Sequence, residues 1–178
     1  MSDTVSGPEL RAVGKNLERE DGADKATGAG MFATDMQLPN MLTARYHRSK
    51  FAHARIRNID VSKAMKVPGV KAVLTSQDCP QDENGDLYGF GSMMADYTIL
   101  AHKKVRFVSE PIAAVAATNE DAAADGADLI EVDYEELPAV FDPLEAMEDG
   151  APIIHENLEN YPVVPGFTPV PVSYTHLT

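Results

Sequence analysis

Alternation of apolar and polar residues predicts most of the strands of this chain. Over residues 41–47 the two kinds of side chain alternate with the period of two that is typical of a half-buried strand. The apolar positions also predict strands over 54–59, 70–75 and 130–135. Residues 111–118, "PIAAVAAT", form a continuous apolar run instead, which indicates a strand buried on both faces.

Short helices are predicted after three of these strands. Asp60 begins a helix, "DVSKAMKV", that ends at the helix-hostile pair Pro68-Gly69. Asn119 caps "EDAAADGADLI", whose first-turn acids favour the positive helix end, and Asp142 caps "DPLEAME". The order strand, helix, strand occurs twice. It predicts an α/β (α+β) domain, with a mixed sheet and short covering helices.

Composition divides the chain into four segments. Residues 1–24 are polar and charged without a sustained period, and we expect an N-terminal arm there. The predicted elements lie in a domain over 25–149, which includes a glycine-rich, acidic loop over 77–98. Residues 150–171 indicate a proline-rich linker towards further domains. The last residues, 172–178, resemble translated adapter sequence and are expected to be non-native, so we expect an N-terminal fragment of a longer protein.

The charge of the chain is unevenly distributed. All 15 Lys and Arg residues lie in residues 1–106, whereas residues 107–178 hold 15 acids and no base, and the net charge is -13. A surface of one negative sign argues against binding to nucleic acid or to an anionic membrane. It is typical of a solvated acidic face, and it would also suit a basic partner.

Several classes of protein are disfavoured by simple absences from the sequence. No apolar run approaches the roughly 20 residues that cross a bilayer, and the N-terminus lacks the apolar core of a signal peptide. Cys79 is the only cysteine, which excludes a disulfide framework within the chain. A cytoplasmic location is the simplest expectation.

Two motifs resemble cofactor sites. "GAGMFA" (28–33) fits a loose dinucleotide fingerprint, but no buried strand precedes it and no acid lies at 47–53. It is better interpreted as a turn leading into the first strand. "YGFGSMM" (88–94) resembles a glycine–aromatic loop, and we assign it no cofactor role.

The remaining reactive side chains form no recognisable catalytic or metal-binding motif. His47 and His53 lack the spacing that places two ligands on one helix face, and His155 has no second histidine four residues on. Cys79 lies in an acidic loop, a poor setting for a thiolate. Glu110, close to Arg106 and next to a buried strand, is interpreted as half of an ion pair rather than as a catalytic acid.

The stretch "ARYHRSKFAHARIRNID" (44–60) is unusually basic, with five Lys or Arg residues against one acid. Its alternation predicts two strands with 48–53 as their connection. Arg45 and His47 have the same parity, opposite to Tyr46, and are expected on the solvent or partner side. We expect the basic side chains to contact the acidic half of the chain or a neighbouring domain.

Four stretches occur in a characteristic order and spacing: "KATGAGMFATDMQLPNMLTA" (25–44), "RSKFAHARIRNIDVSKAMKVPGVKAVLTSQD" (48–78), "KKVRFVSEPIAAVAATNEDAA" (103–123) and "IEVDYEELPAVFDPLEAM" (130–147). Together they resemble the α/β hammerhead domain of the xanthine dehydrogenase and aldehyde oxidase family, and the resemblance covers about residues 8–160. Three residues depart from the family pattern: Phe32 replaces a common Tyr, Lys50 a frequent Pro, and Ser109 the usual Gly before Glu110.

The resemblance implies an oxidoreductase that hydroxylates an aromatic heterocycle or an aldehyde with oxygen from water. The family's molybdopterin cofactor is held by domains that follow the hammerhead domain, so we expect this fragment to be structural and inactive alone. We expect no catalytic, cofactor-binding or metal-ligating residue in it. The implied partners are the downstream molybdopterin-binding domains, iron–sulfur and FAD subunits or domains, a small-molecule substrate and a possible homodimer.

A second hypothesis is a free-standing acidic module that binds a protein with a basic surface. It rests on the charge of residues 107–178 alone. A third, an independent hydrolase or nucleotide-binding enzyme, has no motif in its favour.

Overall fold

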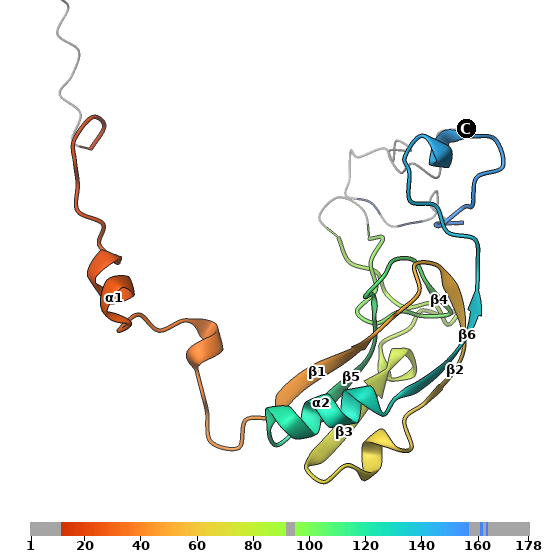
Figure 1. Ribbon diagram of the computed structural model, residues 1–178, viewed down its shortest axis with the longest axis horizontal. Helices are drawn as coiled ribbons and strands as arrows, with labels where there is room; N and C mark the ends of the chain where they lie inside the picture. Colours follow the sequence, from red (N-terminus) through yellow and green to blue (C-terminus); the bar gives the residue numbers. More distant parts are fainter. Residues whose placement is uncertain (1–11, 92–94, 157–160, 162, 164–178) are drawn as a thin grey trace, which may run out of the picture. The chain divides into compact units, whose positions relative to one another are not determined.

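A computed structural model of the chain describes residues 12–91, 95–156, 161 and 163 (Figure 1). The chain divides into two compact units, Met1–Pro39 and Asn40–Thr178. The predicted tail over 172–178 and most of the linker over 150–171 lie outside the described residues.

The first unit contains one short helix, α1 (Gly22–Thr27), and a 3-10 turn over Ala33–Asp35. We expected an arm without regular structure as far as residue 24, and α1 crosses that position. No apolar period indicates this helix, because α1 buries no residue and therefore needs no apolar face. Gly28 ends α1 with a φ of 75°, a left-handed conformation that glycine adopts readily.

The second unit is built on two antiparallel sheets of three strands. The first has the order β1 (Thr43–Arg48), β5 (Pro111–Ala117), β3 (Val70–Thr75), with β5 at the centre. The buried run at 111–118 is therefore a central strand, as its composition predicts.

The second sheet has the order β4 (Lys104–Val105), β2 (Ala54–Asp60), β6 (Glu131–Glu136). The described pairings are all antiparallel and lie in two sheets, whereas the sequence predicted one mixed sheet. In both sheets, strands that follow each other directly in the sequence do not pair with each other. β1 and β2 are separated by only a short connection, yet they enter different sheets.

Helix α2 (Glu120–Asp128) covers one face of the first sheet and contacts all three of its strands (Figure 1). The predicted cap is confirmed, since the Asn119 side chain accepts a hydrogen bond of 2.8 Å from the amide of Ala122. The helix face against the sheet consists of small residues, which let the helix lie close to the strands: Ala122, Ala123, Gly126 and Ala127.

The two other predicted helices are shorter than expected. They are 3-10 turns over Ala64–Lys66 and Glu145–Met147, and a further turn covers Ser76–Asp78. Leu144, not the predicted Asp142, is the N-cap residue of the second turn, although the Asp142 carboxylate accepts a hydrogen bond of 2.7 Å from the Leu144 amide. Each of the two predicted turns buries a single alanine, too little apolar surface to stabilise a longer helix.

Strand β5 contributes to two apolar clusters. Ala113 and Val115 face α2 and pack with Ile130, while Ile112 points to the other side. Ile112 joins Val105 and other residues of the second cluster, beside the sheet of β2 and β4. Opposite faces of one strand thus join the two sheets into one unit. Among the described helices, none is long and apolar enough to cross a bilayer.

Candidate functional site

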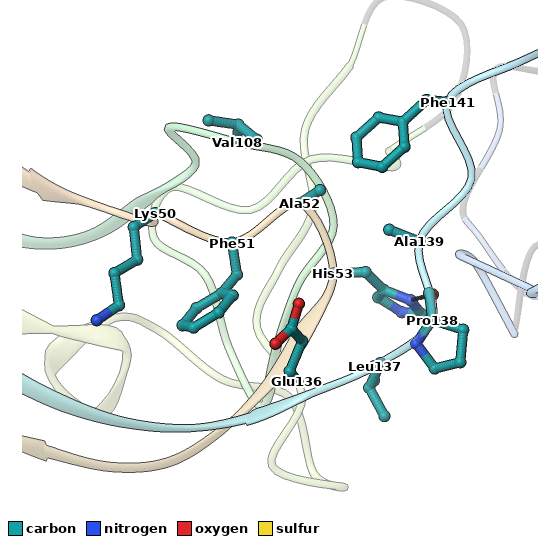
Figure 2. A pocket seen from close by; sticks show the side chains of 10 residues that line it. All are labelled: Lys50, Phe51, Ala52, His53, Val108, Glu136, Leu137, Pro138, Ala139 and Phe141. Atoms are coloured by element: carbon teal, nitrogen blue, oxygen red, sulfur yellow. Dashed lines mark hydrogen bonds between the residues drawn. The ribbon is translucent and has the colours of Figure 1, made fainter.

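Three segments that are distant in sequence meet at one concave site of about 680 Å³ (Figure 2). They are residues 50–53 between β1 and β2, Val108 in the turn before β5, and residues 136–141 from the end of β6 onward. Figure 2 shows the imidazole of His53 beside Pro138. Each segment comes from one of the stretches that carry the family resemblance, so those stretches share a location as well as an order.

Backbone hydrogen bonds fasten the β1–β2 connection to the turn before β5. The Ser49 amide donates to the carbonyl of Glu110 (2.9 Å), and the Ser109 amide donates to the carbonyl of Ser49 (2.8 Å). The Arg48 guanidinium adds a bond of 2.9 Å to the Ser109 carbonyl. We call these contacts among Arg48, Ser49, Ser109 and Glu110 the latch. It fixes two chain reversals against each other with main-chain groups.

His53 joins the same connection to the end of β6. Its side chain is buried, and its Nδ1 lies 2.6 Å from the Pro138 carbonyl, so Nδ1 carries the proton and donates. The Leu137 amide in turn donates to the His53 carbonyl (3.0 Å). Burial lowers the pKa of His53 below its usual value, which keeps the imidazole neutral. The geometry gives His53 a structural role as a tie between strands.

Glu110 lies at the centre of the latch and is 8% exposed. The sequence predicted an ion pair with the Arg106 side chain, and this detail is wrong. The carboxylate instead accepts a hydrogen bond of 2.5 Å from the Arg106 main-chain amide. Burial raises the pKa of Glu110, with the opposing effects of that amide and of the nearby Arg106 charge being smaller. A buried carboxyl that binds an amide within its own turn holds the turn in shape.

The backbone conformation at Ser109 explains why the family usually has Gly at this position. Its φ is 70°, in the left-handed region where a non-glycine residue costs about 1–2 kcal/mol. The family's usual Gly at this position adopts that conformation without a steric penalty.

Replacing Ser109 with Gly is therefore expected to stabilise the protein by about 0.5–1 kcal/mol, the relief of strain less the entropy of the freer unfolded chain. Urea unfolding measures the change. Ser62→Gly is the matched control, because Ser62 is exposed and does not have a positive φ. The control should lose stability, and a loss in Ser109→Gly as well would contradict the explanation.

A second concave site, of about 710 Å³, is lined by residues of β2 and β4, among them Lys104. Lys104 is only 6% exposed, and its ammonium donates to the carbonyl of Ile154 (2.7 Å) and to the carboxylate of Glu156 (2.6 Å). Burial lowers the pKa of Lys104. A buried ammonium requires such partners, so Lys104 ties residues 154–156 to β4. No local sequence pattern indicates a contact across 50 residues.

The other candidates from the sequence are not brought together. His47 contacts the Ala127 carbonyl at the end of α2 through Nδ1 (2.8 Å), and His155 contacts the Tyr161 hydroxyl (3.0 Å). Burial raises the pKa of the Cys79 thiol, which disfavours a thiolate. Among the described residues, no group of three or more His, Cys, Asp or Glu side chains is placed to hold a metal ion.

The two glycine motifs serve the path of the backbone. "GAGMFA" (28–33) follows α1 and not a strand, which removes the context that a dinucleotide site needs. In "YGFGSMM" (88–94), Gly89 lies so close to the Ala95 carbonyl that a side chain would collide with it. Residues 92–94 of this motif lie outside the described part of the chain.

The basic stretch 44–60 does meet the acidic half of the chain. Arg45 lies 3.7 Å from Glu120 of α2, and Arg57 pairs with Glu135 of the neighbouring strand. Arg45 and His47 therefore face α2, so the side expected to meet solvent or a partner is the side that the helix covers. Internal pairing of these acids weakens the hypothesis of a free acidic surface for a basic partner.

Comparison with known proteins agrees with this fold. Residues 27–138 match the family described as "Aldehyde oxidase and xanthine dehydrogenase, a/b hammerhead domain". The chain is 39% identical over 152 residues to the carbon monoxide dehydrogenase large chain of Afipia carboxidovorans, covering 85% of this chain and 18% of that one. It is 37% identical over 149 residues to the nicotinate dehydrogenase large molybdopterin subunit of Eubacterium barkeri, covering 84% and 34%.

Solved structures give the same result. The reconstituted CO dehydrogenase from Oligotropha carboxidovorans superimposes with a TM-score of 0.73 at 38% identity, over 83% of this chain and 18% of that one. Quinoline 2-oxidoreductase from Pseudomonas putida 86 gives 0.68 at 33% identity, over 82% and 19%. This chain thus spans about a third or less of the length of these relatives. It belongs to the aldehyde oxidase and xanthine dehydrogenase family, of which it contains the α/β hammerhead domain.

Proposed function

We propose that this domain is the N-terminal part of the large, molybdopterin-binding subunit of a molybdenum hydroxylase. The observation that carries the proposal is the match over residues 27–138, together with one relative named as a large chain and another named as a large molybdopterin subunit. The enzyme would hydroxylate an aromatic heterocycle or an aldehyde, with the oxygen drawn from water. A cytoplasmic location fits this assignment.

The role of the domain in that enzyme is structural. The two concave sites are lined by side chains that hold the chain together, namely His53 in the first and Lys104 in the second, and both contact backbone groups of other segments. Glu110 of the latch lies outside both sites and binds a backbone amide of its own turn. None of the three is paired with a nucleophile in the described residues. These residues position a scaffold and leave the chemistry to the rest of the subunit.

Among the described residues no group of three or more His, Cys, Asp or Glu side chains is placed to hold a metal ion, and we assign the molybdenum cofactor to the downstream domains. We therefore derive no reaction step through it in this domain. When bound by the downstream domains, the cofactor would supply the redox chemistry. Iron–sulfur clusters and FAD in partner subunits or domains would carry the electrons away, and the complex would form a homodimer.

The test is to follow the reading frame on the source DNA and to express the complete subunit with its neighbouring genes. We expect several hundred further codons, and molybdenum in the purified complex by elemental analysis. Deleting residues 40–149 should abolish assembly of that complex. A frame that stops naturally near residue 160, with no large downstream domain, would refute the proposal.

A further inference from the structure

The sheet β1-β5-β3 has a second face, opposite to α2, that is apolar and open. Side chains alternate across a sheet, so the residues between those buried under α2 point to this other side. Five of the six described positions on it are alanine or leucine, the sixth is a tyrosine, and none is acidic or basic; they are Ala44, Tyr46, Ala72, Leu74, Ala114 and Ala116. We call this set the outer face.

The register of the strands gives the outer face a defined relief. Tyr46, Ala114 and Leu74 lie opposite one another in one row across the three strands. The next row consists of alanines alone. Large side chains on the two edge strands therefore flank the small side chain of Ala114 on β5 in the first row only.

The outer face is exposed where a core would be expected. Tyr46 is 46% exposed and Leu74 is 48% exposed. Ile112 precedes Ala114 by two residues on the same side of β5, and it is fully buried in the second apolar cluster. The outer face thus adjoins the second apolar cluster, but no described residue of the domain covers Tyr46 and Leu74 fully.

We propose that the outer face is the surface on which the downstream part of the same large subunit packs. This inference rests on the proposed function and adds the location of the contact. A contiguous, mainly apolar face with no acidic or basic residue among its six positions is typical of permanent interfaces, whereas transient ones are more polar. In the two relatives described above, two-thirds or more of the chain lies outside the matched region, so a large covalently attached partner is at hand.

The chemistry of the occupant follows from the relief of the outer face. The alanines allow close approach of a helix or an extended segment, and Tyr46 and Leu74 offer it apolar surface. The Arg48 guanidinium lies 5.3 Å from the centroid of the Tyr46 ring, so one basic group borders the outer face. We expect the occupant to be apolar across the outer face and polar or acidic only near Arg48.

Cysteine labelling in the complete native subunit tests the location. Leu74→Cys places a thiol on the outer face, and Met65→Cys is the matched control, because Met65 is 50% exposed on the 3-10 turn that packs beside α2. Labelling rates with a maleimide are read by peptide mass spectrometry and divided by the rates in urea. The Cys at position 74 should react at least about tenfold more slowly than the Cys at 65, because a packed apolar interface excludes solvent and reagent.

A photoreactive maleimide at position 74 then identifies the occupant, with Tyr46→Cys as a second attachment point if Leu74→Cys does not fold. Cross-links to residues beyond 178 of the same polypeptide support the proposal. Equal labelling at 74 and 65, or cross-links to residues 1–39, to a second copy or to another subunit, would overturn it. These outcomes do not contradict the proposed function, which is refuted only if the reading frame lacks a large downstream domain.

Discussion

Gly126→Val is expected to destabilise the domain by about 2–3 kcal/mol, because overpacking a close helix–sheet contact forces neighbours out of their rotamers. Gly126 lies on the buried face of α2. A Cβ atom added there would lie 2.9 Å from Cγ1 of Val115 and 3.0 Å from Cγ2 of Val70, distances that real contacts do not show. A valine adds two further carbons at the same place, so α2 would have to move away from the sheet.

Thermal and urea unfolding measure the effect. The matched control is Ala124→Val, which adds a β-branched residue to the same helix at a partly exposed position. The control should cost only about 0.5 kcal/mol, the difference in helix propensity. Similar losses for the two variants would show that α2 does not press on β3 and β5 as the structure describes.

The close contact at Gly126 also illustrates what the sequence predicts and what it does not. Residues 120–128 are recognisable as a helix from the Asn119 cap and the first-turn acids, and β5 from its unbroken apolar run. Both signals are local. The need for a glycine at 126 arises from Val70 and Val115 on other elements, and no local pattern reports it.

Strand pairing is the part of the fold that local patterns left open. β2 pairs with β6, more than 70 residues away, and not with β1, which precedes it directly. The choice depends on which faces can be buried together, and alternation is equally compatible with one sheet or two. Strand β4 has only two residues, too few for any periodic signal.

The sequence identifies individual residues of the candidate site, but it does not predict which of them lie together in space. The resemblance places Ser49 and His53 in one family stretch and Glu110 in another. It does not say that they converge, or that Glu110 binds the amide of Arg106 instead of its guanidinium. The role of Lys104 is not predicted from the sequence, because its partners, Ile154 and Glu156, lie in a segment whose prolines indicate a linker that leaves the domain.

The latch lies at the start of β5, and β5 contributes both to the second apolar cluster and to the outer face. Pro111 is the first residue of β5, and the Glu110 carbonyl before it accepts from Ser49. Loss of the latch would therefore loosen the strand that both sheets depend on. Glu110 is the residue at which this dependence can be measured.

Glu110→Ala is expected to cost about 1–3 kcal/mol, because it leaves the amide of Arg106 without its acceptor in a buried setting. Glu110→Gln is the matched comparison. A glutamine keeps an oxygen that can accept from the same amide and removes the charge, so it should be less destabilising than alanine. Urea unfolding at pH 7 gives both values.

The pH dependence of the glutamine variant provides a sharper test. Since burial raises the pKa of Glu110 in the folded state above its ordinary value of 4.5, the folded protein holds the neutral carboxyl better than the unfolded chain does. Its contribution to stability is complete below pH 4.5 and is lost as the pH rises through the folded-state pKa. Glu110→Gln has no such loss, so its stability relative to the unmodified protein should improve between pH 4.5 and pH 7. A relative stability that falls over that interval would mean that the Arg106 amide and charge outweigh burial, and that Glu110 belongs to an ion pair after all.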